Sequence, residues 1–313
     1  MKKKILAVFL LFTILLSGCG AATDDEVSGE TVTFTDDLGR SVTVSNPKRV
    51  AALLGSFAQI WQLAGGVVSA TADDAWEDLH LELSEDTVNL GNTKHLNLEL
   101  LFASEPDFIL ASTNTAQNLE WKDLLEPTGI PVAYFDIDDF DDYLRLLKIC
   151  TEITGKYENY ELYGEDVQAQ IDKVIEKSVQ RIKTKGAPTV LCMVASASAV
   201  YAKNSDGNVL GAMLNSLGCR NIADSDSMLL ENVSLEHILV SDPEYIFFVQ
   251  RGDDEVGMKK YVQQFLMDNP AWSELTAVKN GRVYFMEKNL FNLKPNHRWG
   301  EAYEIMEEIL ANE

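Results

Sequence analysis

Basic residues are scarce in this chain. Its 313 residues include 26 Lys and Arg against 49 Asp and Glu, which gives a formal net charge of −23. A phosphate backbone or an anionic lipid surface would repel such a chain, so we expect neither nucleic-acid binding nor electrostatic adhesion to a membrane. Hydrophobic residues nevertheless make up 46% of the sequence, which is enough for one or two hydrophobic cores.

Motifs for catalysis and for metal binding are also missing. The four histidines form no close-spaced pair of the kind seen in zinc sites, so we expect no directly bound metal and no cofactor (His80, His95, His237 and His297). The sequence has no Gly-x-Ser-x-Gly elbow, His-Glu-x-x-His motif, Walker loop or dinucleotide fingerprint. We therefore expect no catalytic residue and no enzymatic activity.

The sequence has no apolar run long enough to span a bilayer, which needs about 20 helical residues. The run Ile5 to Leu16 follows a basic start and predicts a signal peptide over residues 1–18. Leu16-Ser17-Gly18-Cys19 resembles the lipobox of bacterial lipoproteins, in which the Cys is lipidated. We expect Cys19 and a flexible tether over residues 19–30 to anchor the protein outside the cytoplasm. An ordinary signal peptide with a chance Cys is the alternative.

Three further cysteines remain, and an odd number does not indicate a disulfide framework (Cys150, Cys192 and Cys219). Cys192 lies in an apolar run and is predicted to be a buried thiol. Whether Cys192 pairs with Cys219 stays open at this point.

The body of the chain alternates between short apolar runs and amphipathic stretches. Residues 32–34 and 42–44 alternate apolar and polar side chains around a turn, which predicts a β-hairpin. The other runs predict buried strands over 50–54, 108–111, 132–135, 189–194, 245–249 and 282–285, and helices over 58–64, 140–154 and 301–310.

Residues 157–185 differ from the rest, because they are rich in Glu, Gln and Lys and carry apolar residues at helical spacing. We predict one long interlobe helix over 157–186, which ends at Gly186. It joins an N-terminal lobe (31–156) to a C-terminal lobe (187–313). Strands that alternate with helices indicate mainly parallel sheets. The predicted fold class is therefore α/β, with two Rossmann-like lobes joined by a rigid helix.

The two halves share a segment at an offset of 137 residues (236 minus 99). Asn97-Leu98-Glu99-Leu100-Leu101 leads to Pro106-Asp107, and Ser234-Leu235-Glu236-His237-Ile238 leads to Pro243-Glu244. Asn97 and Ser234 are predicted helix caps. Glu99 and Glu236 fall in the first turn, where the helix dipole alone would favour an acid. Alternatively, related lobes present equivalent acids to one two-fold partner.

Several motifs in order now resemble a known family. They are the lipobox, Asp37-x-x-Gly39-Arg40-x-Val42, Pro47-Lys48-Arg49-Val50, the paired Leu-Glu segments, the long central helix and the segment from Trp272 to Tyr284. Together they resemble the substrate-binding lipoprotein of an ABC importer for iron–siderophore, haem or cobalamin. The resemblance covers essentially the whole mature chain.

The resemblance implies a ligand cleft between the two lobes and small lobe motion, because one connecting helix has little hinge freedom. It implies that Glu99 and Glu236 contact arginines of the membrane permease, which in turn engages its ATPase. The cargo would be a chelated metal, with a ferric siderophore first and haem or cobalamin next. We expect a monomer.

Ligands of open α/β sheets lie beyond the carboxyl ends of the strands. Residues that follow the predicted strands are therefore the candidate ligand-binding set, with cations for an anionic chelate and aromatic faces for stacking: Ser56, Phe57, Trp76, Thr113, Ser196, Arg251, Phe291 and Arg298. Lys94 and His95 are weaker candidates.

Alternatives stay open for two of these residues and for the function. Arg251 begins an acidic loop and could pair with the acids of that loop instead of a ligand. Trp76 could stack on a ligand or cover the core. A lipid-anchored hydrolase, or a surface adhesin or sensor with the same fold, are the alternative functions.

Overall fold

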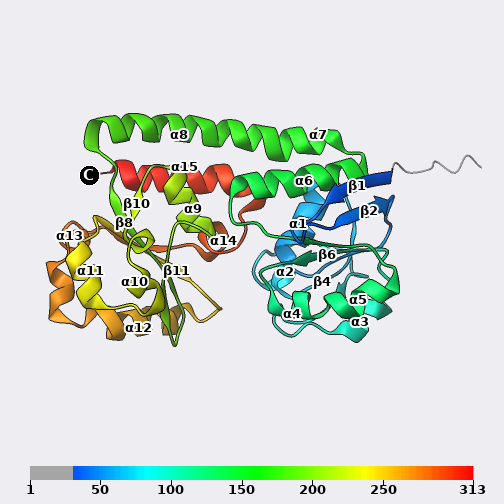
Figure 1. Ribbon diagram of the computed structural model, residues 1–313, viewed down its shortest axis with the longest axis horizontal. Helices are drawn as coiled ribbons and strands as arrows, with labels where there is room; N and C mark the ends of the chain where they lie inside the picture. Colours follow the sequence, from blue (N-terminus) through cyan, green and yellow to red (C-terminus); the bar gives the residue numbers. More distant parts are fainter. Residues whose placement is uncertain (1–30, 313) are drawn as a thin grey trace, which may run out of the picture.

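The computed structural model describes residues 31–312 and shows two α/β lobes side by side, with long helices along one edge of both (Figure 1). This confirms the predicted two-lobed α/β fold. The predicted signal peptide, Cys19 and the tether lie outside the described residues. Within the described part of the chain, no helix is long and apolar enough to cross a membrane.

The N-terminal lobe begins with the predicted hairpin and continues as a parallel sheet with strand order β5-β4-β3-β6-β7. Its elements are β1 (Thr31–Thr35), β2 (Ser41–Ser45), β3 (Val50–Ala52), α1 (Gly55–Leu63), β4 (Val68–Thr71), α2 (Asp74–Glu77), β5 (Val88–Asn89), α3 (Leu98–Ala103), β6 (Phe108–Ser112), α4 (Ala116–Glu120), α5 (Lys122–Leu125), β7 (Val132–Phe135) and α6 (Phe140–Thr154). Parallel pairing brings the carboxyl ends of these strands to one edge.

The C-terminal lobe repeats this plan with strand order β10-β8-β11-β12, and β9 pairs antiparallel with β8. Its elements are β8 (Thr189–Ala195), β9 (Val200–Lys203), α9 (Val209–Ser216), β10 (Arg220–Asn221), α10 (Ser227–Glu231), α11 (Leu235–Ser241), β11 (Tyr245–Gln250), α12 (Glu255–Val262), α13 (Thr276–Lys279), β12 (Val283–Met286), α14 (Lys288–Phe291) and α15 (Trp299–Ala311). A 3₁₀ turn, Asn296–Arg298, leads into α15.

The interlobe helix runs along one edge of both lobes (Figure 1). It consists of α7 (Tyr157–Tyr160), a π-helical turn (Glu161–Glu165) and α8 (Asp166–Lys185), and its cap residue Gly186 has a positive φ of 88°. The π turn was not expected. Gly164 sits in it, and a Cβ there would lie 3.0 Å from the side chain of Leu144 in α6. A close approach of the two helices therefore accompanies the wider turn.

One hydrophobic layer is shared by both lobes. Alternate residues of each sheet face it, such as Val50 and Phe108 in one lobe and Cys192 and Phe247 in the other, and helices α1, α6, α8, α9 and α15 supply the rest. The opposite face of each sheet packs on a separate local core. A core that runs through both lobes opposes their movement relative to each other, since separating them would expose apolar surface.

The C-terminal helix reinforces the interlobe helix. Arg181 of α8 pairs with Glu307 of α15, with Nε 3.0 Å from Oε1. Nη2 of Arg181 also donates to the carbonyl of Leu217 at 3.0 Å. Trp299, at the start of α15, packs its ring edge-on against Phe140 of α6, 6.2 Å between centroids. Three helices, rather than one, therefore brace the two lobes.

The three cysteines of the described residues are free and buried. The structure thus contains no Cys192–Cys219 bridge. Burial raises the pKa of the Cys192 thiol and raises that of Cys219 to about 12, so neither forms a reactive thiolate at neutral pH.

The repeated segment has the same structural role in both lobes. The carboxylate of Asp107 accepts hydrogen bonds from the backbone of Lys48 and Arg49, and that of Glu244 accepts one from Thr189 at 2.8 Å. Each acid thus holds the start of a neighbouring strand. The side chain of Asn97 caps α3 as predicted, whereas Ser234 precedes α11 without a side-chain capping bond.

Candidate functional site

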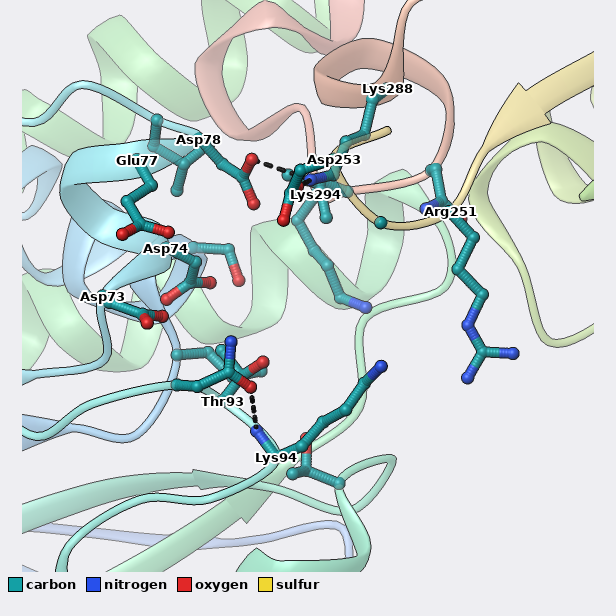
Figure 2. A pocket seen from close by; sticks show the side chains of 18 of the residues that line it. Asp73, Asp74, Glu77, Asp78, Thr93, Lys94, Arg251, Asp253, Lys288 and Lys294 are labelled. Carbon is teal, nitrogen blue, oxygen red and sulfur yellow. Dashed lines mark hydrogen bonds and ion pairs between the residues drawn. The ribbon is translucent and has the colours of Figure 1, made fainter. Parts of the chain in front are cut away.

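A cavity of about 310 Å³ lies between the lobes, at the carboxyl ends of their strands. Most of its lining residues are polar or charged, and none is aromatic (Figure 2). Its lining comprises Leu54, Ser56, Asp73, Asp74, Glu77, Asp78, Leu79, Asn92, Thr93, Lys94, Ser112, Asn114 and Thr115 from the N-terminal lobe, and Arg251, Gly252, Asp253, Lys288, Asn292, Leu293 and Lys294 from the C-terminal lobe.

The N-terminal wall is acidic and is built on α2. Oδ1 of Asp74 accepts a hydrogen bond from the backbone N–H of Gly55, 2.8 Å away, at the start of α1. Only glycine fits at position 55, because a Cβ would lie 2.5 Å from the backbone nitrogen of Ala75. Burial raises the pKa of Asp74 to about 6. Asp73 and Glu77 lie on the same side of the cavity (Figure 2).

One lysine connects the lobes beside the cavity. Nζ of Lys288, from the start of α14, lies 2.7 Å from a carboxylate oxygen of Asp78 and 2.8 Å from one of Asp253. The amide of Asn289 donates to the carbonyl of Asp78 at 2.9 Å. These contacts join α2 to the C-terminal lobe, and they neutralise two of the acids that line the cavity.

Arg251 directly follows β11 and is exposed at the cavity. The acids of its own loop are occupied elsewhere: Asp253 pairs with Lys288, Asp254 caps α12 through the N–H of Gly257, and Glu255 pairs with Lys259. Among the described residues, Arg251 therefore has no carboxylate partner within ion-pair distance. The structure favours the interpretation that its guanidinium is available to a ligand.

Lys294 points into the same cavity from the segment after α14 (Figure 2). Burial lowers the pKa of Lys294, whereas the carboxylates of Asp138 and Asp136 favour its charged form. Within residues 31–312 it forms no ion pair within 4 Å. Lys94, in the loop after β5, faces the cavity from the opposite lobe. Lys94, Lys294 and Arg251 thus converge on one space, and none of them has a carboxylate within 4 Å in the part of the chain that the structure describes.

The cavity includes only part of the predicted ligand-binding set. Ser56, Arg251 and the weaker candidate Lys94 line it. Thr113 lies between the lining residues Ser112 and Asn114 but does not line the cavity itself.

Three further predicted residues lie away from the lining. Trp76 is half-buried on α2, and His95 is exposed. The hydroxyl of Ser196 accepts hydrogen bonds from the backbone of Ser198 and Ala199, within the turn that joins β8 to β9.

The remaining predicted residues serve the scaffold. Phe57 is fully buried and Phe291 is 3% exposed, both in the shared core, because their helices turn these side chains away from the cavity. Arg298 pairs with Glu301, with Nε 2.7 Å from Oε2, and lies within 3.7 Å of Glu287. The predicted set did not include the acids of α2, Lys288 or Lys294, which also line the cavity. All of them follow strand ends or short helices at the cleft.

Glu99 and Glu236 are exposed in the first turns of α3 and α11. These helices belong to different lobes, and both lie on the half of the molecule away from α8 (Figure 1). The imidazole of His237, next to Glu236, lies 2.9 Å from a carboxylate oxygen of Asp226.

Comparison with known proteins now identifies the family. Residues 50–290 match the periplasmic binding protein family. The chain belongs to this family. A curated relative, the Fe(3+)-citrate-binding protein YfmC of Bacillus subtilis, is 26% identical over 300 residues, which cover 91% of this chain and 89% of the relative. The iron(3+)-hydroxamate-binding protein FhuD of the same organism is 23% identical and covers 91% of this chain and 90% of its own length.

Solved structures of periplasmic binding proteins show the same fold. Staphylococcus aureus SirA in complex with staphyloferrin B superposes with a TM-score of 0.71 at 20% identity, over 90% of this chain and 99% of that one. Staphylococcus aureus IsdE in complex with haem gives 0.68 at 14% identity, over 84% and 99%. The resemblance inferred from sequence motifs is confirmed. Periplasmic binding proteins of this type are the substrate-binding components of ABC transporters, with a small-molecule ligand and a permease partner.

Proposed function

We propose that this protein captures a ferric chelate whose chelator supplies anionic oxygens, and delivers it to an ABC permease. The observation that carries the proposal is the convergence of Arg251, Lys94 and Lys294 on one interlobe cavity, without carboxylate partners among the described residues. Guanidinium and ammonium groups form strong charge-assisted hydrogen bonds with carboxylate oxygens. Three cations in one cavity repel each other, and an anionic ligand would offset that repulsion. Such a cluster is notable in a chain of net charge −23.

The lining of the cavity favours a ferric siderophore or ferric citrate over haem. None of its lining residues is His, Met, Tyr or Cys, the side chains that ligate haem iron. None is aromatic, so the lining offers no flat face for a porphyrin. Iron would therefore arrive and leave inside its chelator, and the protein would need neither a cofactor nor a directly bound metal. The name of the relative YfmC supports this choice of ligand class.

The rest of the transport assembly follows from the family. We propose that Glu99 and Glu236 contact arginines of the permease, which couples to its ATPase, and that the binding protein acts as a monomer without enzymatic activity. We also propose that lipidated Cys19 anchors it outside the cytoplasm, as the lipoprotein names of two relatives support. Reversal of either acid, Glu99→Arg or Glu236→Arg, should abolish iron uptake and leave chelate affinity unchanged. Glu158→Arg, an exposed acid on α7, is the matched control.

Direct binding tests the choice of ligand. The soluble body, starting after Cys19, is titrated calorimetrically with ferric citrate, a ferric hydroxamate, haem and cobalamin. We expect binding of a ferric chelate with anionic oxygens, ferric citrate first. The bound chelate at one hundred times its dissociation constant should add about 2.7 kcal/mol to the free energy of unfolding. Binding of haem or cobalamin alone would contradict the proposal.

A further inference from the structure

The two walls of the interlobe cavity carry opposite charge. Figure 2 shows Asp73, Asp74 and Glu77 on one side, all from the α2 region of the N-terminal lobe. Across the space lie the cations Lys94, Lys294 and Arg251 (Figure 2). The two sets do not neutralise each other, since no ion pair within 4 Å joins them in the described part of the chain. An anionic cargo explains the cations but leaves the acids unexplained.

Two acids of the wall, Asp73 and Glu77, are not used by the scaffold. Asp78 and Asp253 already share Lys288, and Asp74 accepts the N–H of Gly55. The carboxylates of Asp73 and Glu77, in contrast, make no hydrogen bond or ion pair within residues 31–312. A purely anionic ligand in this cavity would lie against unpaired like charge, which disfavours binding.

A second observation on the same wall also indicates a ligand. Ser56 lines the cavity at the start of α1, beside the Gly55–Asp74 contact, and is only 6% exposed. Within residues 31–312 its hydroxyl makes no hydrogen bond, and it is open to the cavity. This hydroxyl can accept a hydrogen bond from a ligand N–H or donate one to a ligand oxygen.

A metal ion is not the partner that the acids would hold. In the part of the chain that the structure describes, no group of three or more His, Cys, Asp or Glu residues is arranged to hold a metal ion. The carboxylates are spread along α2 rather than gathered around one point (Figure 2). An organic cation of some length, such as a protonated amine within a chain, fits such a wall.

We propose that the cargo is a zwitterionic chelate, whose iron-binding end is anionic and lies toward Arg251, Lys94 and Lys294. Its other part carries a protonated amine that pairs with Asp73 and Glu77, with the hydroxyl of Ser56 beside it. This inference rests on the proposed function and narrows its substrate class. The acidic wall then selects among anionic chelates, because it attracts those with an amine and repels those without one.

A matched pair of synthetic chelators tests the inference. Two citrate groups are joined through amides to spermidine in one chelator and to 1,8-diaminooctane in the other. The spacers have the same number of chain atoms and differ in one of them, a protonated NH₂⁺ in place of CH₂. The ferric complexes, with ferric citrate as a reference, are titrated into the wild-type soluble body by calorimetry. We expect the spermidine chelate to bind about tenfold more tightly, equivalent to about 1.4 kcal/mol.

Two variants test whether Asp73 and Glu77 cause the tighter binding of the spermidine chelate. Asp73→Asn/Glu77→Gln should remove it by weakening the spermidine chelate, while the diaminooctane chelate binds as well or better. Glu85→Gln removes an exposed acid of the same lobe outside the cavity and should retain the preference. Equal binding of the two chelates to the wild type, or a preference that survives in the double variant, would overturn the inference.

Binding of ferric citrate, which has no amine, tests the proposed function independently of the zwitterionic cargo. If ferric citrate binds and neither dicitryl chelate does, the zwitterionic cargo is overturned and the proposed function stands. If none of the three binds, ferric citrate as the expected cargo is overturned, and this inference with it; the titration with the ferric hydroxamate then decides the proposed function.

Discussion

Replacing Glu307 by leucine should destabilise the whole molecule, although this residue does not line the ligand cavity. Glu307 and Arg181 are the buried ion pair between α15 and α8, with side chains 8% and 6% exposed. Two nitrogens of the guanidinium contact the carboxylate, at 3.0 Å each. Removal of the acid leaves a buried guanidinium that keeps neutral partners, such as the carbonyl of Leu217, but loses its carboxylate.

The magnitude follows from this geometry. Loss of one partner of a buried ion pair costs about 3–5 kcal/mol, because the other charge stays desolvated. For a domain of this size, each kcal/mol lowers the melting temperature by about 2 °C, so Glu307→Leu should melt about 6–10 °C below wild type. The double variant Arg181→Met/Glu307→Leu removes both charges and should lie within about 1–2 kcal/mol of wild type.

Urea unfolding followed by circular dichroism measures these differences, with the single and double variants compared in one cycle. The exposed pair Lys259–Glu255 provides the control, since its side chains are 50% and 59% exposed. Glu255→Leu should cost under about 1 kcal/mol. The reasoning is refuted if Glu307→Leu costs no more than this control, or if the double variant is as unstable as the sum of the two single variants.

Three further predictions concern the cleft and the thiols. Arg251→Gln should weaken binding of the ferric chelate about 10- to 100-fold by calorimetry, whereas Arg220→Gln, an exposed arginine outside the cleft, should have no effect. Because burial raises the pKa of Asp74 to about 6, the folded state binds a proton that the unfolded state releases, and stability falls as pH rises from about 4 to 6. Asp74→Asn should therefore be more stable than wild type by about 1–3 kcal/mol at pH 7.5, and equally stable at pH 4, in urea titrations. Cys192 and Cys219 should react with a thiol reagent only on unfolding, and a native protein that reacts at once would contradict their burial.

The sequence predicts most of the scaffold, because periodicity reports which faces are buried. The helix over 140–154 and the strands at 108–111 and 132–135 are found within one residue of their predicted bounds. Hydrophobic periodicity does not predict the π turn at Glu161–Glu165. It depends on tertiary contacts: Gly164 packs beside Leu144, and the hydroxyl of Tyr143 donates to the carbonyl of Tyr163 at 2.9 Å.

The ligand site is less predictable, because position after a strand does not fix the direction of a side chain. Ser56 and Phe57 are neighbours on α1, yet one lines the cavity and the other lies in the core. Trp76 was chosen from the turn after β4 for its aromatic face, whereas the structure brings the neighbouring acids Asp73 and Asp74 to the cavity. Lobe-to-lobe contacts such as Lys288–Asp78 join residues 210 positions apart and leave no local signal.

The brace of three helices has a consequence for the order in which the molecule can fold. The partners of the Arg181–Glu307 pair lie 126 residues apart, and α15 is the last helix of the described residues. A chain that emerges with its N-terminus first can form the sheet of the first lobe early, but the shared core stays incomplete until the final turn of α15 has been released. Without α15, apolar surface of both lobes would stay open to solvent and to proteases. Closure of the shared core is therefore a late step when the chain folds during its synthesis.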